Sequence, residues 1–190
     1  VAQHLIKQHI GPGSLVGLYT QPSPEMLSGM LGILKTGAAY VCLDPVYPAQ
    51  MLKFIVEECE LSFLLTTSNF EKAFPVHGIP ALLLDNDLII NSQPQTNPSL
   101  LLSSNTPAFI VYTSGSSGIP KGVIHAHRNL ISRFYSTWDF APTREDEVYA
   151  QTSTLSSIDL IDEIYAALLR GYRVQLIDAE KVRDPNLFVE

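Results

Sequence analysis

The sequence AFIVYTSGSSGIPKGVIH, residues 108–125, places a polar loop between two apolar runs. Residues 108–112 are apolar and partly β-branched, which predicts a short buried strand. Residues 122–125 form a second strand-like run, and a helical pattern follows from residue 127 to about 140. Hydroxyl side chains and glycines fill the loop, which ends in Lys121.

The composition of the loop suits the binding of a polyphosphate. Proteins hold phosphate with backbone amides, hydroxyl groups and a cation at close range. Glycines let the backbone approach without a Cβ in the way, and a lysine supplies a mobile point charge. The residues concerned are Thr113, Ser114, Gly115, Ser116, Ser117, Gly118, Lys121 and Gly122. On composition alone, a solvated Gly/Ser surface turn remains an equal alternative.

The loop is not a Walker A loop. The residue five after Gly115 is Pro120 instead of glycine, and Gly122 instead of Ser or Thr follows the lysine. The next element has a strand pattern, whereas a P-loop opens a helix. We therefore expect a loop that lacks a helix dipole and orders around its ligand.

The first half of the chain alternates strands and helices. Ser23 is a suitable helix cap, Pro24 fits the first turn and Gly37 closes that helix. The pattern predicts four strands, at 15–19, 39–43, 62–66 and 81–84. It also predicts three helices: one that ends near residue 9, one from residue 24 to the stop at Gly37, and one over 49–59. A βαβα order implies a parallel sheet with helices on its faces.

Residues 86–107 are rich in Asn, Ser, Gln and Pro, which is typical of a linker. A second series follows, with further elements expected at 147–151 (strand), 158–170 (helix) and 172–177 (strand). We predict an α/β fold of two mostly parallel sheets joined by this linker. Residues 1–85 would form a first subdomain, incomplete at its start, and residues 108–190 a second, incomplete at its end.

Composition and charge exclude several classes of protein. The chain has 46% hydrophobic and 16% charged residues, as globular domains do. Its net charge of −7 provides no overall positive field, so we expect neither nucleic acid nor a membrane as partner. Residues 88–120 contain no charged residue, but several Asn and Pro residues interrupt them, which favours a linker over a membrane span.

Cysteine usage and the chain start give two further expectations. Cys42 and Cys59 have no partners at metal-ligand spacing, so we expect reduced thiols and a cytoplasmic location. His125 and His127 can share a strand face, yet with no third ligand in sight we predict no metal site. The chain begins at Val1 without a methionine, and we expect a segment of a longer protein.

Residues 113–122 together with His127 resemble the ATP-phosphate loop of the adenylate-forming superfamily. This superfamily comprises acyl-CoA synthetases, luciferases and the adenylation domains of nonribosomal peptide synthetases. Serines stand here for the two usual threonines and keep the hydroxyls. A second block, LKTGAAYVCLDPVYP at 34–48, resembles the signature of peptide-synthetase adenylation domains, with Cys42 in place of the usual proline. Met51 stands where an arginine is common.

The resemblance implies a reaction in which a carboxylate and ATP give acyl-AMP and pyrophosphate, and the acyl group then passes to a thiol. It also implies that this chain is part of the N-terminal domain of such an enzyme. The hydroxyls and backbone amides of residues 113–118 would then bind the β- and γ-phosphates of ATP. Lys121 would be catalytic and neutralise the departing pyrophosphate. ATP and Mg²⁺ are the implied cofactors, with the Mg²⁺ ligands outside this segment, and the acceptor is a phosphopantetheine carrier protein or CoA. An inactive nucleotide-binding relative, or a truncated fragment without catalysis of its own, is the alternative.

The run SIDLIDEIY, residues 157–165, resembles the helix that opens the acyl-substrate pocket, where an aspartate pairs with the substrate's α-amino group. Alignment without a gap puts Ile158 at that position and Asp159 and Asp162 at neighbouring pocket positions. This alignment favours an acid without an α-amino group, such as an aryl, hydroxy or keto acid, or else a degenerate site, whereas a shift by one residue would restore Asp159. The alternative is that the acids form the solvated face of an amphipathic helix.

Overall fold

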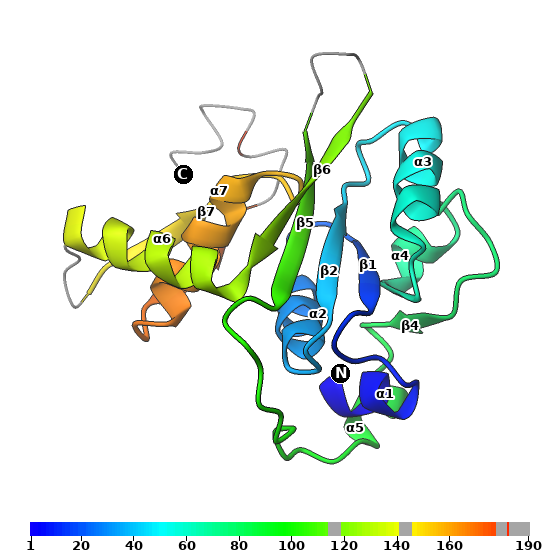
Figure 1. Ribbon diagram of the computed structural model, residues 1–190, viewed down its shortest axis with the longest axis horizontal. Coiled ribbons are helices and arrows are strands. Elements are labelled where there is room, and N and C mark those ends of the chain that lie inside the picture. Colours follow the sequence, from blue (N-terminus) through cyan, green and yellow to red (C-terminus); the bar gives the residue numbers. More distant parts are fainter. Residues whose placement is uncertain (114–118, 141–145, 178–181, 183–190) are drawn as a thin grey trace.

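The structure is a computed structural model that describes residues 1–113, 119–140, 146–177 and 182 (Figure 1). In this part of the chain, six strands form one sheet in the order β4-β3-β1-β2-β5-β6, and two further strands form a small parallel sheet. The six are β1 Leu15–Tyr19, β2 Ala39–Leu43, β3 Phe63–Thr66, β4 Ala81–Leu83, β5 Pro107–Thr113 and β6 Lys121–Ala126. The small sheet consists of β7 Val148–Gln151 and β8 Arg173–Leu176. All pairs are parallel except β5 with β6, so the predicted fold class is confirmed.

Helices cover both faces of the large sheet (Figure 1). They are α1 Ala2–Lys7, α2 Pro24–Leu34, α3 Ala49–Cys59, α4 Ser68–Glu71, α5 Asp87–Asn91, α6 His127–Phe140, α7 Ile158–Ile161 and the π-helix η1 Asp162–Ala166. Strands β1 and β2 and helix α3 have the bounds that the sequence predicted. The short helices α4 and α5 were not predicted, and α5 lies inside the expected linker. None of the described helices is long and apolar enough to cross a membrane.

Four strands of the large sheet, β1, β2, β3 and β5, carry buried apolar side chains on both faces. In β1, Val16 and Leu18 belong to one core together with Met26 and Met30 of α2, whereas Tyr19 belongs to a second core with α3. This alternation is the period-two geometry of a strand. Burial from both sides explains why the strands are continuous apolar runs in the sequence.

Burial also fixes the state of the thiol in β2. It raises the pKa of Cys42 to about 12, so this thiol stays protonated.

Strands β5 and β6 extend the first sheet, although the sequence placed them in the second series. Three rings stack across β2, β5 and β6: the centroids of Tyr40 and Phe109 lie 5.4 Å apart, and those of Phe109 and His125 lie 4.6 Å apart. Because β5 is apolar on both faces, it needs cover on both, and it pairs with the open edge of β2. The large sheet therefore runs across the expected linker, and the domain division at 86–107 stays a prediction.

The structure departs from the predicted helix over 158–170 in the interior of that helix. Residues 162–166 form a π-helix between the α-helical turn of α7 and the residues that follow. Such single turns are rare in helices and occur often at functional sites. Trp138 of α6 ties this turn in place, because its indole Nε1 donates to the Ala166 carbonyl at 2.9 Å.

The stop after α2 depends on glycine. Gly37 has φ of +79°, and a Cβ there would lie 2.7 Å from Leu102 Cδ2 and 2.9 Å from Pro12 Cγ. We expect Gly37→Ala to lower the free energy of unfolding by about 2 kcal/mol or more, since backbone strain and side-chain overlap add. Denaturant unfolding measures this.

The matched control is Gly78→Ala. Gly78 has φ of +90°, and a Cβ built there would have no other atom within 4 Å. Only backbone strain should therefore lower the free energy of unfolding, by about 1 kcal/mol. Equal losses in the two variants would contradict the steric part of the argument.

Candidate functional site

The hairpin of β5 and β6 holds the two ends of the predicted phosphate loop. Thr113 and Lys121 are paired residues in its antiparallel ladder, and both are exposed. The Lys121 backbone is thus fixed beside the carboxyl end of β5. The remaining predicted phosphate ligands, Ser114, Gly115, Ser116, Ser117 and Gly118, lie outside the described residues. Their roles stay predictions.

A partly buried contact anchors the strand just before the loop. The Tyr112 hydroxyl donates to Glu58 Oε2 at 2.5 Å and lies 3.1 Å from Cys59 Sγ, both on α3. Burial, followed by these two contacts, raises the pKa of Tyr112, so the phenol stays neutral. A Cβ at Gly122 would lie 3.1 Å from the Tyr112 ring, which explains the glycine opposite it. The sequence analysis did not find this anchor.

The carboxyl ends of β1, β2 and β5 lie at one edge of the sheet, where open α/β sheets bind ligands. A cavity of about 260 Å³ there is lined by residues after β1 and β2 and by residues 151–155, which begin at the last residue of β7. Asp44, only 4% exposed, lies in it. Its Oδ1 accepts from the Val46 amide at 3.0 Å and its Oδ2 from Ser156 Oγ at 2.9 Å. Asp44 therefore joins the large sheet to the segment before α7.

A larger cavity, of about 530 Å³, lies between α1, α2, α5 and residues 93–98. None of the predicted site residues that the structure describes lines this cavity or the smaller one. The smaller cavity is the more relevant one because it lies at the carboxyl edge of the sheet.

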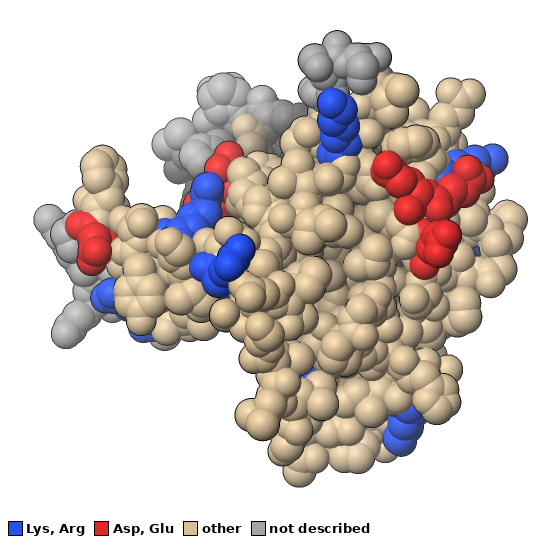
Figure 2. All heavy atoms as spheres, in the orientation of Figure 1, with Lys and Arg blue, Asp and Glu red and all other residues tan. Residues whose placement is uncertain are grey.

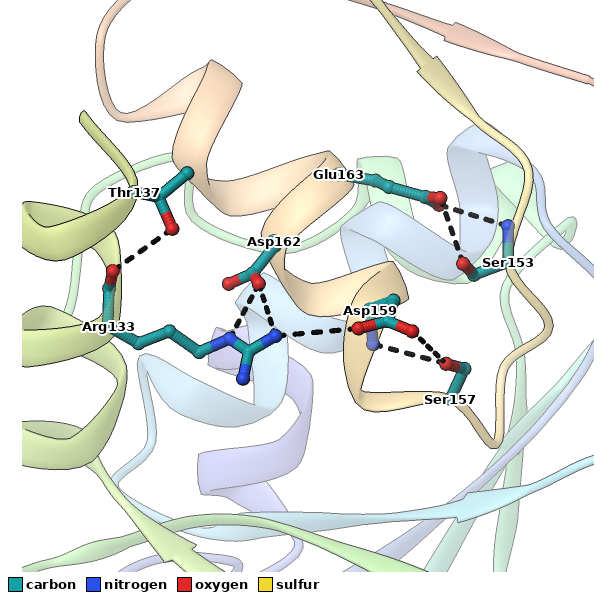
Figure 3. A network of polar contacts seen from close by, with 7 residues as sticks. All are labelled: Arg133, Thr137, Ser153, Ser157, Asp159, Asp162 and Glu163. Atoms are coloured by element: carbon teal, nitrogen blue, oxygen red, sulfur yellow. Dashed lines mark hydrogen bonds and ion pairs between the residues drawn. The ribbon is translucent and has the colours of Figure 1, made fainter. Parts of the chain in front are cut away.

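Glu163 fixes the segment that leads from β7 toward α7 (Figure 3). Its carboxylate accepts four hydrogen bonds: from the amides of Thr152 and Ser153, each at 3.0 Å, and from their hydroxyls at 2.9 and 2.8 Å. From the sequence, Glu163 was either part of the run that carries the resemblance or one of the acids on a solvated helix face. Only the fold shows that it binds residues that are ten and eleven positions away.

The predicted substrate residues separate into two kinds. Ile158 packs against the first core. Asp159 and Asp162 both face Arg133 of α6 (Figure 3): Arg133 Nε donates to Asp162 Oδ2 at 2.5 Å, and Nη2 lies 3.4 Å from Asp159 Oδ1. The Asp159 side chain is 68% exposed and that of Asp162 is 21% exposed. Whether these residues contact a substrate stays a prediction.

The two histidines near the loop lie in different surroundings. Burial lowers the pKa of both, and for His125 the Arg133 charge adds to this. His125 stacks on Phe109, and the buried His127 Nε2 has no hydrogen-bond partner among the described residues. In the described part of the chain, no group of three or more His, Cys, Asp or Glu side chains is placed to hold a metal ion.

Charge is spread thinly over the face shown in Figure 2. Acidic side chains gather over α3, which carries Glu57 and Glu58, and basic side chains are scattered. Any anion that binds on this face must therefore be held by local geometry and not by a broad positive field.

Comparison with known proteins finds one family over the whole chain: "AMP-binding enzyme" matches residues 1–190. A dimodular nonribosomal peptide synthase of Bacillus subtilis (strain 168) is 35% identical over 195 residues, which cover 100% of this chain and 8% of that protein. Gramicidin S synthase 2 of Brevibacillus brevis is 35% identical over 189 residues, which cover 96% of this chain and 4% of that protein. The chain thus spans only a small part of these relatives.

Solved structures give the same fold. The nonribosomal peptide synthetase FmoA3 superposes with a TM-score of 0.90 at 22% identity, covering 100% of this chain and 20% of that chain, also in its AMPPNP-bound form. The N-terminal subdomain of Klebsiella oxytoca NpsA, in complex with 3-hydroxybenzoyl-AMSN, has a TM-score of 0.78 at 26% identity over 93% of this chain and 44% of that chain.

Proposed function

The chain belongs to the AMP-binding enzyme family, and from this we propose that it supplies the phosphate loop and one wall of the acyl pocket of an enzyme that activates a carboxylic acid as an acyl-adenylate. The observation that carries the proposal is the hairpin pairing of Thr113 with Lys121, which supports the two ends of a hydroxyl- and glycine-rich loop at the ligand-binding edge of the sheet. FmoA3 has been solved with AMPPNP bound, which supports a nucleotide at the same fold.

In this proposal, the acid attacks the α-phosphate of ATP and pyrophosphate leaves. Negative charge builds up on the leaving group, so catalysis rests on positioning and on cation stabilisation. Lys121 supplies the cation. The hydroxyls of Thr113, Ser114, Ser116 and Ser117 and the amides at Gly115 and Gly118 hold the β- and γ-phosphates.

The proposal also names a metal and a thiol acceptor. The family implies Mg²⁺, but the described residues contain no group of three or more metal-ligating side chains. As the family resemblance implies, we propose that its ligands lie outside this segment, and we give this chain no metal step. The acyl group would pass to a phosphopantetheine carrier protein or to CoA.

The test is acid-dependent exchange of labelled pyrophosphate into ATP by the full-length protein. A panel of amino, hydroxy, keto and aryl acids is assayed, and a reaction without acid is the control. Exchange with at least one acid is the expected result. No exchange, combined with a nucleotide-dependent rise in melting temperature, would instead favour an inactive nucleotide-binding relative. If neither is seen, the loop has no nucleotide function.

A further inference from the structure

Arg133 lies between the two acids of the predicted substrate helix (Figure 3). Its Nε and Nη2 both lie 2.5 Å from Asp162 Oδ2, and Nη2 also reaches Asp159 at 3.4 Å. Its position on α6 is fixed by packing, since Phe134 beside it is buried in the first core. The hydrogen bond to Asp162 raises the pKa of Arg133, so the guanidinium remains charged.

This ion pair changes which charges the helix can offer a substrate. Asp162 is the less exposed of the two acids, and its charge is compensated by Arg133. A substrate ammonium group brought to Asp162 would lie beside the guanidinium, where like charges repel. Asp159 is 68% exposed and remains hydrated, so it offers an ammonium group little gain over water.

One acceptor in this cluster has no partner among the described residues. Asp162 Oδ1 is buried and receives no hydrogen bond from any of them. A buried acceptor without a donor costs free energy, and an uncharged O–H or N–H donor would satisfy it without adding positive charge. Because Oδ1 is enclosed and Oδ2 is paired with Arg133, Asp162 offers an ammonium group no free counter-charge.

We propose that Arg133 is a specificity-determining residue that acts by neutralising Asp162. As a result, the pocket accepts acids with a neutral donor facing α7, such as a hydroxyl, in preference to acids with an ammonium group there. The inference rests on the proposed function. Arg133 acts through Asp162 and is not itself a catalytic residue. It also supplies a physical reason for the preference for non-amino acids that gap-free alignment of Ile158 suggested.

The experiment compares hydroxy and amino acids that share one carbon skeleton. Pyrophosphate exchange gives kcat/KM for each, and the ratio of hydroxy to amino acid is the readout. We expect Arg133→Gln to lower this ratio about tenfold or more, because Asp162 loses its counter-ion and attracts an ammonium group. Arg133→Lys keeps the charge and should hold the ratio within about threefold. The control is Arg128→Gln, because Arg128 is an exposed arginine of the same helix that has no ion pair among the described residues. This variant should leave the ratio unchanged.

A second variant guards against a folding defect. Arg133→Gln combined with Asp162→Asn removes both charges and should restore the ratio toward that of the unmodified protein. A ratio that stays unchanged in Arg133→Gln, in protein with an unaltered melting temperature, overturns the inference while the proposed function stands. A ratio that the double variant does not restore also counts against it. No exchange by the unmodified protein with any acid is a failure of the proposed function itself.

Discussion

Lys121→Ala is expected to slow ATP–pyrophosphate exchange by about 10²–10³-fold in the full-length protein. The lysine is the only cation of the predicted loop, and the charge that builds up on the leaving pyrophosphate has no other counter-charge within residues 113–122. Its side chain is exposed at the start of β6 and belongs to neither core. We therefore expect the melting temperature to change little, and the loss should fall on kcat as well as on the KM for ATP.

Two further variants sharpen this test. Lys121→Arg keeps a positive charge and should recover part of the rate, although a planar guanidinium is a poor substitute for a mobile point charge. Lys53→Ala removes an exposed lysine of α3 and should leave exchange unaffected. An unchanged rate of ATP–pyrophosphate exchange in Lys121→Ala would contradict the proposal that this residue neutralises pyrophosphate.

Glu163→Ala is expected to have the largest effect on stability, a loss of about 3 kcal/mol in the free energy of unfolding. The substitution leaves the amides of Thr152 and Ser153 and their hydroxyls without the acceptor that binds all four. Bonds to a charged acceptor are stronger than neutral ones, and donors left partly buried lose their water as well. Denaturant unfolding at constant slope gives the value.

Glu163→Gln is the matched variant. It keeps the shape and one carbonyl acceptor but replaces the other oxygen with a donor, so we expect an intermediate loss. Glu57→Ala, at an exposed position of α3, should cost less than about 0.5 kcal/mol. A similar loss in Glu163→Ala and Glu57→Ala would show that the four hydrogen bonds add nothing to stability.

Elements with a strong local pattern were predicted closely. The Ser23 cap, which accepts from the Met26 amide at 3.1 Å, and the apolar runs of β1 and β2 are properties of neighbouring residues. The short helices α4 and α5 carry little periodicity, so the sequence did not reveal them. The π-turn of η1 was missed for a similar reason, since its composition does not differ from that of an α-helix.

Local sequence patterns were sufficient to predict the α/β class, the position of the predicted phosphate loop between two strands and the resemblance to adenylate-forming enzymes, because each depends on residues close together in the chain. Three contacts were found only in the folded chain: β5 pairs with β2, Asp44 accepts from Ser156, and Arg133 neutralises Asp162. These contacts join residues far apart in the chain. A strand that is apolar on both faces pairs with whichever sheet edge is open, and a charged side chain pairs with whichever counter-ion packing brings near, so neither partner can be predicted from local pattern.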